Sequence, residues 1–139
     1  MEVMQDIFDI MRANTYLKSL VQCVKVTGLE NKLNRPGFFY TVFAPSETAF
    51  DNLHEVELEG WLKAESKIKL LNILYNHIIE GQFSIDDLLM RRKFRTINGK
   101  ILQIEKLNNS VSINNAPVKE QGKTASNGIV YLVDKIFTS

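Results

Sequence analysis

The sequence predicts an α+β protein whose helices come mainly before residue 77 and whose strands come mainly after residue 93. Apolar residues in the first half recur at the spacing of amphipathic helices. The stretch 38–43, FFYTVF, is aromatic and β-branched, which is typical of a buried strand. The last third alternates apolar and polar residues between asparagine-rich turns, as antiparallel strands do.

Length and composition point to one globular unit. The chain has 139 residues, and we expect residues 1–139 to form a single domain. Its 45% hydrophobic and 24% charged residues are ordinary for such a domain. A net charge of +1 argues against nucleic acid as a partner, and no apolar run reaches the roughly 20 residues of a transmembrane helix. Cys23 is the only cysteine, so no disulfide can form within the chain and a core position is expected for it.

Two helices are expected before the first strand. Residues 2–13 and 15–27 each place apolar side chains on one face, with Asn14 as a cap between them. Gly28 can adopt the left-handed conformation that ends the second helix, and 29–33 predicts one further turn.

The stretch 38–53 is expected to be a strand, a corner and a helix. Pro45 cannot donate to a strand ladder, so the strand ends there, and Ser46 is a candidate cap for a helix starting at Glu47. Phe50 lies on the apolar face of this helix and is expected to join it to the sheet.

One polar segment raises the question of a metal site. It contains an imidazole and three carboxylates, from His54, Glu55, Glu57 and Glu59. Zinc sites usually combine several His or Cys ligands in a fixed geometry, so a solvated surface turn is the favoured interpretation and no metal is expected.

The middle of the chain predicts a buried helix at 66–76 with Ser66 as its cap, and a strand at 77–83. Ser84 is expected to cap a short turn through Leu88.

The last third predicts an antiparallel sheet. Asn98-Gly99 is a strong hairpin signal, placed between strands at 94–97 and 100–106. Further strands are expected at 111–113 and 129–137, and Pro117 limits its own segment to a sheet edge or a strand start.

Four blocks in this order resemble the fasciclin-type (FAS1, β-ig-h3/fasciclin) domain family. They are TVFAPSETAF (41–50), LLNILYNHIIEGQFSIDDL (70–88), SINNAPV (112–118) and ASNGIVYLVDKIF (125–137). The positions that carry the resemblance, mainly in structural roles, are Thr41, Phe43, Pro45, Phe50, His77, Gly81, Asn127, Gly128 and Asp134. The resemblance implies a FAS1-like β-wedge or sandwich of about seven mostly antiparallel strands, with several α-helices packed on one side.

The sequence departs from the family pattern at three places. Asn76 stands where family members often carry a tyrosine, Tyr131 replaces a frequent histidine, and Asn115 replaces a frequent glycine. In the family, a Tyr-His neighbourhood and an acidic Asp-Ile pair are connected with integrin recognition. Gly122 and Lys123 occupy the place of that pair here, so integrin binding is not expected for this chain.

No catalytic constellation is expected. Ser46 is explained as a helix cap, Cys23 as a core residue, and only His54 and His77 could serve as imidazole bases. The glycines are scattered at turns instead of forming a phosphate loop, so no cofactor is predicted.

Candidate partner-binding residues form two groups. One group is a basic cluster that could bind a polyanionic glycan, although such runs are more often solvated loops. It consists of Arg91, Arg92, Lys93 and Arg95, with Phe94 among them. Tyr75 and His77 could belong to a recognised surface, although a structural role at the helix-to-strand junction is favoured for His77.

The resemblance implies a non-enzymatic binding or cell-adhesion module that contacts proteins or glycans at a cell surface or in an extracellular matrix. An intracellular protein-binding domain on the same scaffold is the alternative, since the N-terminus lacks the pattern of a secretory signal. The sequence upstream in the gene would separate the two.

Overall fold

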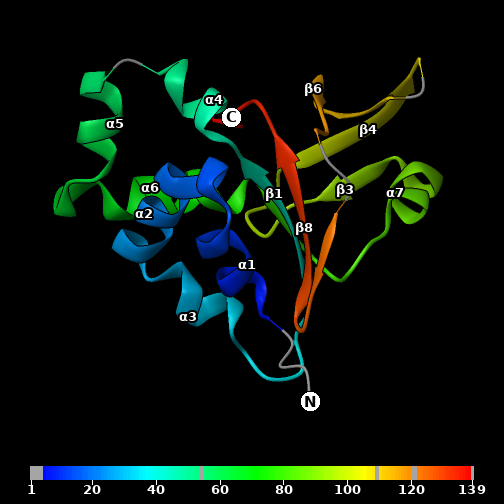
Figure 1. Ribbon diagram of the computed structural model, residues 1–139, viewed down its shortest axis with the longest axis horizontal. Helices are drawn as coiled ribbons and strands as arrows, with labels where there is room; N and C mark the ends of the chain where they lie inside the picture. Colours follow the sequence, from blue (N-terminus) through cyan, green and yellow to red (C-terminus); the bar gives the residue numbers. More distant parts are fainter. Residues whose placement is uncertain (1–4, 54, 109, 120–121, 139) are drawn as a thin grey trace.

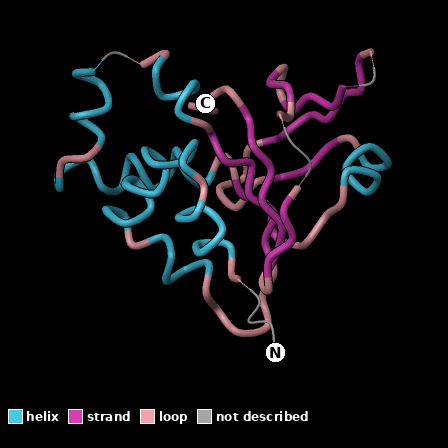
Figure 2. The backbone as a smooth tube through the Cα atoms, viewed as in Figure 1, coloured by secondary structure: helices cyan, strands magenta, loops and turns pink. Residues whose placement is uncertain are grey.

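The computed structural model describes residues 5–53, 55–108, 110–119 and 122–138. In this part of the chain, eight strands form two four-stranded sheets, and most of the helices lie on one side of them (Figures 1 and 2). The predicted α+β fold is confirmed. One helix, α7, is an exception to the one-sided packing, because it lies beside β3 and β4 (Figure 1).

The described helices and strands have the following bounds. The helices are α1 (Ile7–Ala13), α2 (Lys18–Thr27), α3 (Leu29–Leu33), α4 (Glu47–Asp51), α5 (Glu55–Trp61), α6 (Lys67–Tyr75) and α7 (Ile85–Arg91), with 3-10 turns η1 (Thr15–Leu17) and η2 (Ala64–Ser66). The strands are β1 (Tyr40–Pro45), β2 (Ile78–Glu80), β3 (Lys93–Arg95), β4 (Ile101–Leu107), β5 (Ser110–Ile113), β6 (Ala116–Pro117), β7 (Lys123–Ala125) and β8 (Gly128–Val133).

A central parallel pair organises the first sheet, which has the order β2-β1-β8-β7. β1 and β8 run in register from Tyr40 opposite Gly128 to Pro45 opposite Val133, whereas the other described strand pairs are antiparallel. Every residue of both strands is buried. This burial on both faces is typical of parallel strands covered by other layers.

Alternate residues of the central pair serve two different cores. Val42 and Val130 pack with α1, α2 and α6 in a core between the first sheet and the helices. Phe43 and Tyr131 face the second core, which lies between the two sheets. Their rings stack with centroids 5.7 Å apart. The second sheet, β3-β4-β5-β6, supplies buried residues such as Leu102 to that core.

Three of the predicted helix ends agree with the structure. Gly28 ends α2 in the left-handed conformation (φ 72°), and the Asn14 side chain accepts a hydrogen bond from Tyr16 N at the start of η1. Ser84 and Asp87 form a reciprocal capping box at the start of α7.

Two predicted caps are wrong. Ser46 and Ser66 precede α4 and α6, but neither side chain makes a capping hydrogen bond. At α4 the backbone carbonyl of Ser46 already accepts from Ala49 N and Phe50 N. At α6 the backbone of Ser66 (φ −99°, ψ 6°) is not in the extended conformation that directs a side chain back onto the helix amides.

Several element boundaries differ from the sequence-based expectation. β1 begins at Tyr40, and Phe38 and Phe39 are 37% and 47% exposed in the preceding loop. The strand expected at 77–83 is limited to β2, because Gly81 follows in a conformation (φ 107°) that leaves the strand. Of the helix expected at 2–13, residues 2–4 lie outside the described residues, and α1 starts at Ile7 with Asp6 as its cap.

Candidate functional site

The basic cluster lies where α7 ends and β3 begins. Arg91 is the last residue of α7, Arg92 follows it in the left-handed conformation (φ 64°), and Lys93 and Arg95 belong to β3. All four side chains are exposed. The structure therefore places the predicted cluster at the surface, but its side chains make different contacts within the chain.

Arg91 and Arg92 make the closest contacts with their own domain. The guanidinium of Arg91 lies 5.4 Å from the ring centroid of Phe83 and 4.7 Å from that of Phe94. The two rings meet edge to face, 4.9 Å apart. Arg92 Nε donates a hydrogen bond to the carbonyl of Leu89. These contacts favour a packing role for Arg91 and a helix-terminating role for Arg92.

Lys93 and Arg95 lie on the opposite face of β3 from buried Phe94, because side chains alternate along a strand. Their cross-strand neighbours on β4 are Gln103 and Ile101, and Ile101 is 47% exposed. The cluster thus divides into Arg91 and Arg92, which contact their own domain at the end of α7, and Lys93 and Arg95, which lie on the outward face of β3.

His77 is buried and anchors the C-terminal segment. Its ring is 2% exposed and stacks on the Phe137 ring, with centroids 4.8 Å apart. Nδ1 lies 2.9 Å from the carbonyl of Ile73, and Nε2 accepts a hydrogen bond from Phe137 N at 2.9 Å. This pair of partners fits the neutral ring with its proton on Nδ1.

Burial also sets the charge state of His77. Because burial disfavours the charged imidazolium, the pKa of His77 falls from 6.5 to about 4. Both ring nitrogens are hydrogen-bonded inside the protein, so His77 offers no exposed group to a partner, and the structural role is favoured. Tyr75 is half-buried, and Lys32 Nζ lies 5.6 Å from the centroid of its ring.

Asn76, which in the sequence is only a departure from the family pattern, joins three segments in the structure. Its Nδ2 donates to the carbonyl of Phe137 at 2.7 Å, and its Oδ1 accepts from Asn98 Nδ2 at 2.7 Å. Asn98 Nδ2 also donates to the carbonyl of Asn72 at 3.0 Å. This amide network ties the end of α6 to the C-terminal segment and to the turn between β3 and β4.

Apart from half-buried Asp134, which forms an ion pair, the other motif residues are buried or bonded to backbone from distant segments. Thr41 Oγ1 donates to the carbonyl of Gly81 at 2.7 Å and accepts from Phe83 N at 3.1 Å. Asp134 pairs with Lys119 Nζ at 3.0 Å. Phe50 lies in the core between the first sheet and the helices, and Phe43 lies in the core between the two sheets. Pro45 ends β1 opposite Val133.

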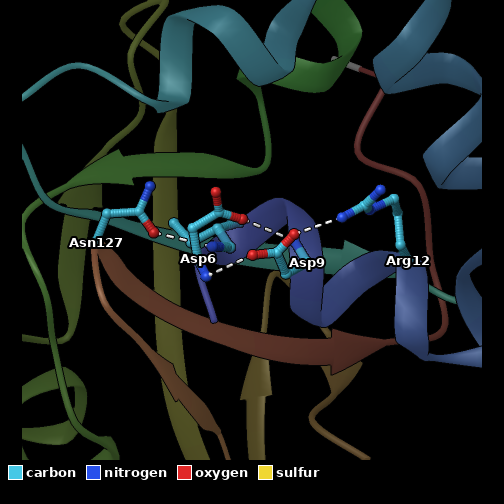
Figure 3. A network of polar contacts seen from close by, with 5 residues as sticks. Asp6, Asp9, Arg12 and Asn127 are labelled. Carbon is cyan, nitrogen blue, oxygen red and sulfur yellow. Dashed lines mark hydrogen bonds and ion pairs between the residues drawn. The ribbon is translucent and has the colours of Figure 1, made fainter. Parts of the chain in front are cut away.

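Asn127 and Gly128 close the narrow end of the molecule. Figure 3 shows Asn127 directed at the first turn of α1, where its Oδ1 accepts from Ile7 N at 2.9 Å. Its Nδ2 donates to the carbonyl of Leu33 at 3.0 Å. A Cβ at Gly128 would lie 1.8 Å from the carbonyl oxygen of Tyr40, so only glycine fits beside β1.

The groups considered for catalysis are enclosed or outside the described residues. Cys23 is fully buried, and burial together with the charge of Glu47 raises its pKa to about 12. The Ser46 hydroxyl is buried and has no hydrogen-bond partner among the described residues. His54 lies outside the described residues. Within the described ranges, no three His, Cys, Asp or Glu side chains gather as metal ligands.

Two open grooves mark the described surface. The first, here called the α6 groove, has a volume of about 830 Å³ and lies between α5, α6 and the turn joining β3 to β4. Six of its lining residues are Glu57, Ile68, Lys69, Asn72, Asn98 and Lys100, and Trp61 and Thr138 also line it. The second has a volume of about 540 Å³ and lies beside β8, between Asp86 and Lys119.

Comparison with known proteins identifies the family. The fasciclin domain model matches residues 15–139. The chain belongs to the fasciclin-domain family. Transforming growth factor-beta-induced protein ig-h3 of Oryctolagus cuniculus is 31% identical over 130 residues, which cover 94% of this chain and 19% of that protein. Cell surface glycolipoprotein MPB83 of Mycobacterium bovis is 34% identical over 100 residues, which cover 70% of this chain and 42% of that protein.

A solved structure shows the same fold. It is a FAS1 domain pair from the insect cell adhesion molecule Fasciclin I, with a TM-score of 0.87, 14% identity, and coverage of 97% of this chain and 51% of that one. The predicted fasciclin-type fold is confirmed. Among the described helices, none combines the length and the apolar character needed to cross a bilayer.

The departures from the fasciclin pattern have local structural explanations. Tyr131, in the place of a frequent histidine, donates its hydroxyl to the carbonyl of Phe83 at 2.7 Å. Asn115, in the place of a frequent glycine, has φ 68°, a conformation that asparagine tolerates better than most residues. Asn76 joins the C-terminal segment to α6.

Proposed function

We propose that this fasciclin domain, residues 1–139, is a non-enzymatic adhesion-type module that contacts a protein or glycan at a cell surface or in an extracellular matrix. The observation that carries the proposal is the family match over residues 15–139. The words "cell surface" and "cell adhesion" in the names of MPB83 and Fasciclin I support the setting.

The state of the reactive side chains supports a binding role over catalysis. A general base must reach the proton that it abstracts, and His77 has both ring nitrogens occupied in the interior. A nucleophilic thiol needs a lowered pKa, and the pKa of Cys23 is raised to about 12. The hydroxyl of Ser46 has no base beside it among the described residues.

A binding screen tests the proposal. The purified chain is immobilised and exposed to an array of glycans, to matrix proteins and to whole cells, and turnover of ester, glycoside and peptide substrates is measured in parallel. We expect saturable binding in at least one arm and no turnover. Absence of binding in every arm would contradict the proposal, and so would turnover that is lost in a His77→Gln variant.

The Arg91–Arg95 cluster is tested in two halves. A Lys93→Gln/Arg95→Gln variant removes the outward charges, and an Arg91→Gln/Arg92→Gln variant removes the same charge from side chains that contact their own domain. If the cluster contributes to binding, the first variant should weaken it more than the second. Equal binding by the wild type and both variants would remove the cluster from the proposal.

A further inference from the structure

The α6 groove has the dimensions of a ligand site. Its volume of about 830 Å³ lies within the roughly 300–1,000 Å³ of typical small-ligand sites. Two of its three sides are tied together, because Asn98 of the β3–β4 turn donates to the carbonyl of Asn72 and to the side chain of Asn76 on the α6 side. A ligand would therefore meet these two sides already fixed relative to each other, which lowers the entropy cost of binding.

The charge of the groove is positive and comes from separate elements. Lys69 of α6 and Lys100 of the turn both line it, and neither forms an ion pair with a described residue. Arg95 extends the positive surface beside the turn, since its Nη1 lies 3.5 Å from the carbonyl of Gly99. Glu57 is the one acidic residue that lines the groove in the described structure.

The remaining lining suits a sugar. Ile68 is 78% exposed and offers an apolar surface for the C–H face of a pyranose ring. The Asn72 amide, which no described residue engages through a hydrogen bond, and the Thr138 hydroxyl can bond to ring hydroxyls. Nucleic acid is disfavoured because Trp61, the aromatic side chain of the described lining, is 5% exposed and cannot offer a base-stacking face.

We propose that the α6 groove binds a short segment of an acidic glycan, with Lys69 and Lys100 contacting its carboxylate or sulfate groups. This inference rests on the proposed binding function and specifies the ligand class and the site. An acidic peptide is the competing occupant, which the polar amides and the exposed Ile68 favour less.

The experiment uses the intact chain and measures binding by calorimetry at several salt concentrations. The probes are a heparin hexasaccharide, a hyaluronan hexasaccharide, neutral maltohexaose and a hexaglutamate peptide. The first two distinguish sulfate from carboxylate recognition. The groove variants locate the binding site in the calorimetry. Trp61, the only tryptophan in the chain, is in the groove lining but 5% exposed, so its fluorescence is recorded only as a second readout.

Three variants define the expected result. Lys69→Gln/Lys100→Gln should weaken binding of the acidic hexasaccharide at least tenfold and reduce the slope of log K against log salt by about two, one for each lysine. Lys18→Gln/Lys123→Gln removes the same charge from α2 and β7, outside the groove, and should change the affinity less than twofold. Glu57→Gln should strengthen binding several-fold.

The outcomes separate this inference from the proposed function. Equal loss in the groove and control variants, tighter binding of maltohexaose, or tighter binding of hexaglutamate that depends on the same lysines would overturn the glycan assignment. If the wild type binds none of the four probes but binds a protein or cells in the screen, the acidic-glycan inference fails and the proposed function stands. If it binds nothing in either experiment, both fail.

Discussion

Asn127→Ala should destabilise the fold by about 2–3 kcal/mol, because its side chain holds two other segments. Its Oδ1 accepts from Ile7 N at the start of α1, and its Nδ2 donates to the carbonyl of Leu33 at the end of α3. The side chains of Ile7 and Leu33 are 0% and 2% exposed, so water does not readily replace the lost partner. Each backbone group left unpaired costs about 1–3 kcal/mol, and we take the lower part of that range because both bonds are partly buried.

Urea unfolding followed by Trp61 fluorescence and by circular dichroism measures this loss. Asn31→Ala is the matched control, since Asn31 is exposed on α3, and it should change the free energy of unfolding by less than about 0.5 kcal/mol. Asn127→Asp keeps an acceptor for Ile7 N but removes the donor to Leu33, so it should retain the first bond only. A loss below about 0.5 kcal/mol for Asn127→Ala, or a loss equal to that of the control, would refute the reasoning.

Three further predictions concern the helical side of the fold and its buried groups. Glu47→Ala should cost about 2 kcal/mol in urea unfolding, because the Glu47 carboxylate accepts from Ser19 N at 2.6 Å and Ser19 Oγ at 2.9 Å at the start of α2; exposed Glu65→Ala should cost much less. The unfolded chain binds the His77 proton more tightly than the folded one, so the stability contributed by the neutral ring is complete above pH 6.5. About 3 kcal/mol of it is lost progressively as the pH falls from 6.5 to about 4, and His77→Gln should flatten that part of the pH profile. Cys23 should react with iodoacetamide only after denaturation, because burial raises its thiol pKa to about 12; rapid labelling of the folded chain would show that the core opens there.

Features set by neighbouring residues could be predicted from the sequence. The Asn98-Gly99 turn joins β3 and β4 as expected, and Gly28 ends α2, because turn and cap geometry depends on a few adjacent residues. The inward positions of β4, Leu102 and Ile104, follow directly from strand alternation. Family resemblance added the arrangement of these elements, which local patterns alone do not give.

Features set by distant residues were missed. The sequence does not reveal that β1 pairs in parallel with β8, because register between segments this far apart depends on packing over both faces. The same limit applies to Arg91, whose place over two aromatic rings depends on Phe83 from another segment. The α6 groove could not be foreseen for this reason, since α6 and the β3–β4 turn meet only in the folded chain.

The residues that identify the family and those that select a ligand occupy different parts of the molecule. Thr41, His77 and Asn127 each bond to backbone groups of distant segments, so these side chains hold the scaffold together and leave little side-chain surface for a partner. Lys69 and Lys100 are exposed, and neither is among the motif positions that carry the resemblance. On this division, Lys69→Glu/Lys100→Glu should abolish acidic-glycan binding while the free energy of unfolding in urea stays within about 0.5 kcal/mol of wild type, since exposed charges contribute little to stability. A large loss of stability in that variant would mean that the lysines belong to the scaffold after all.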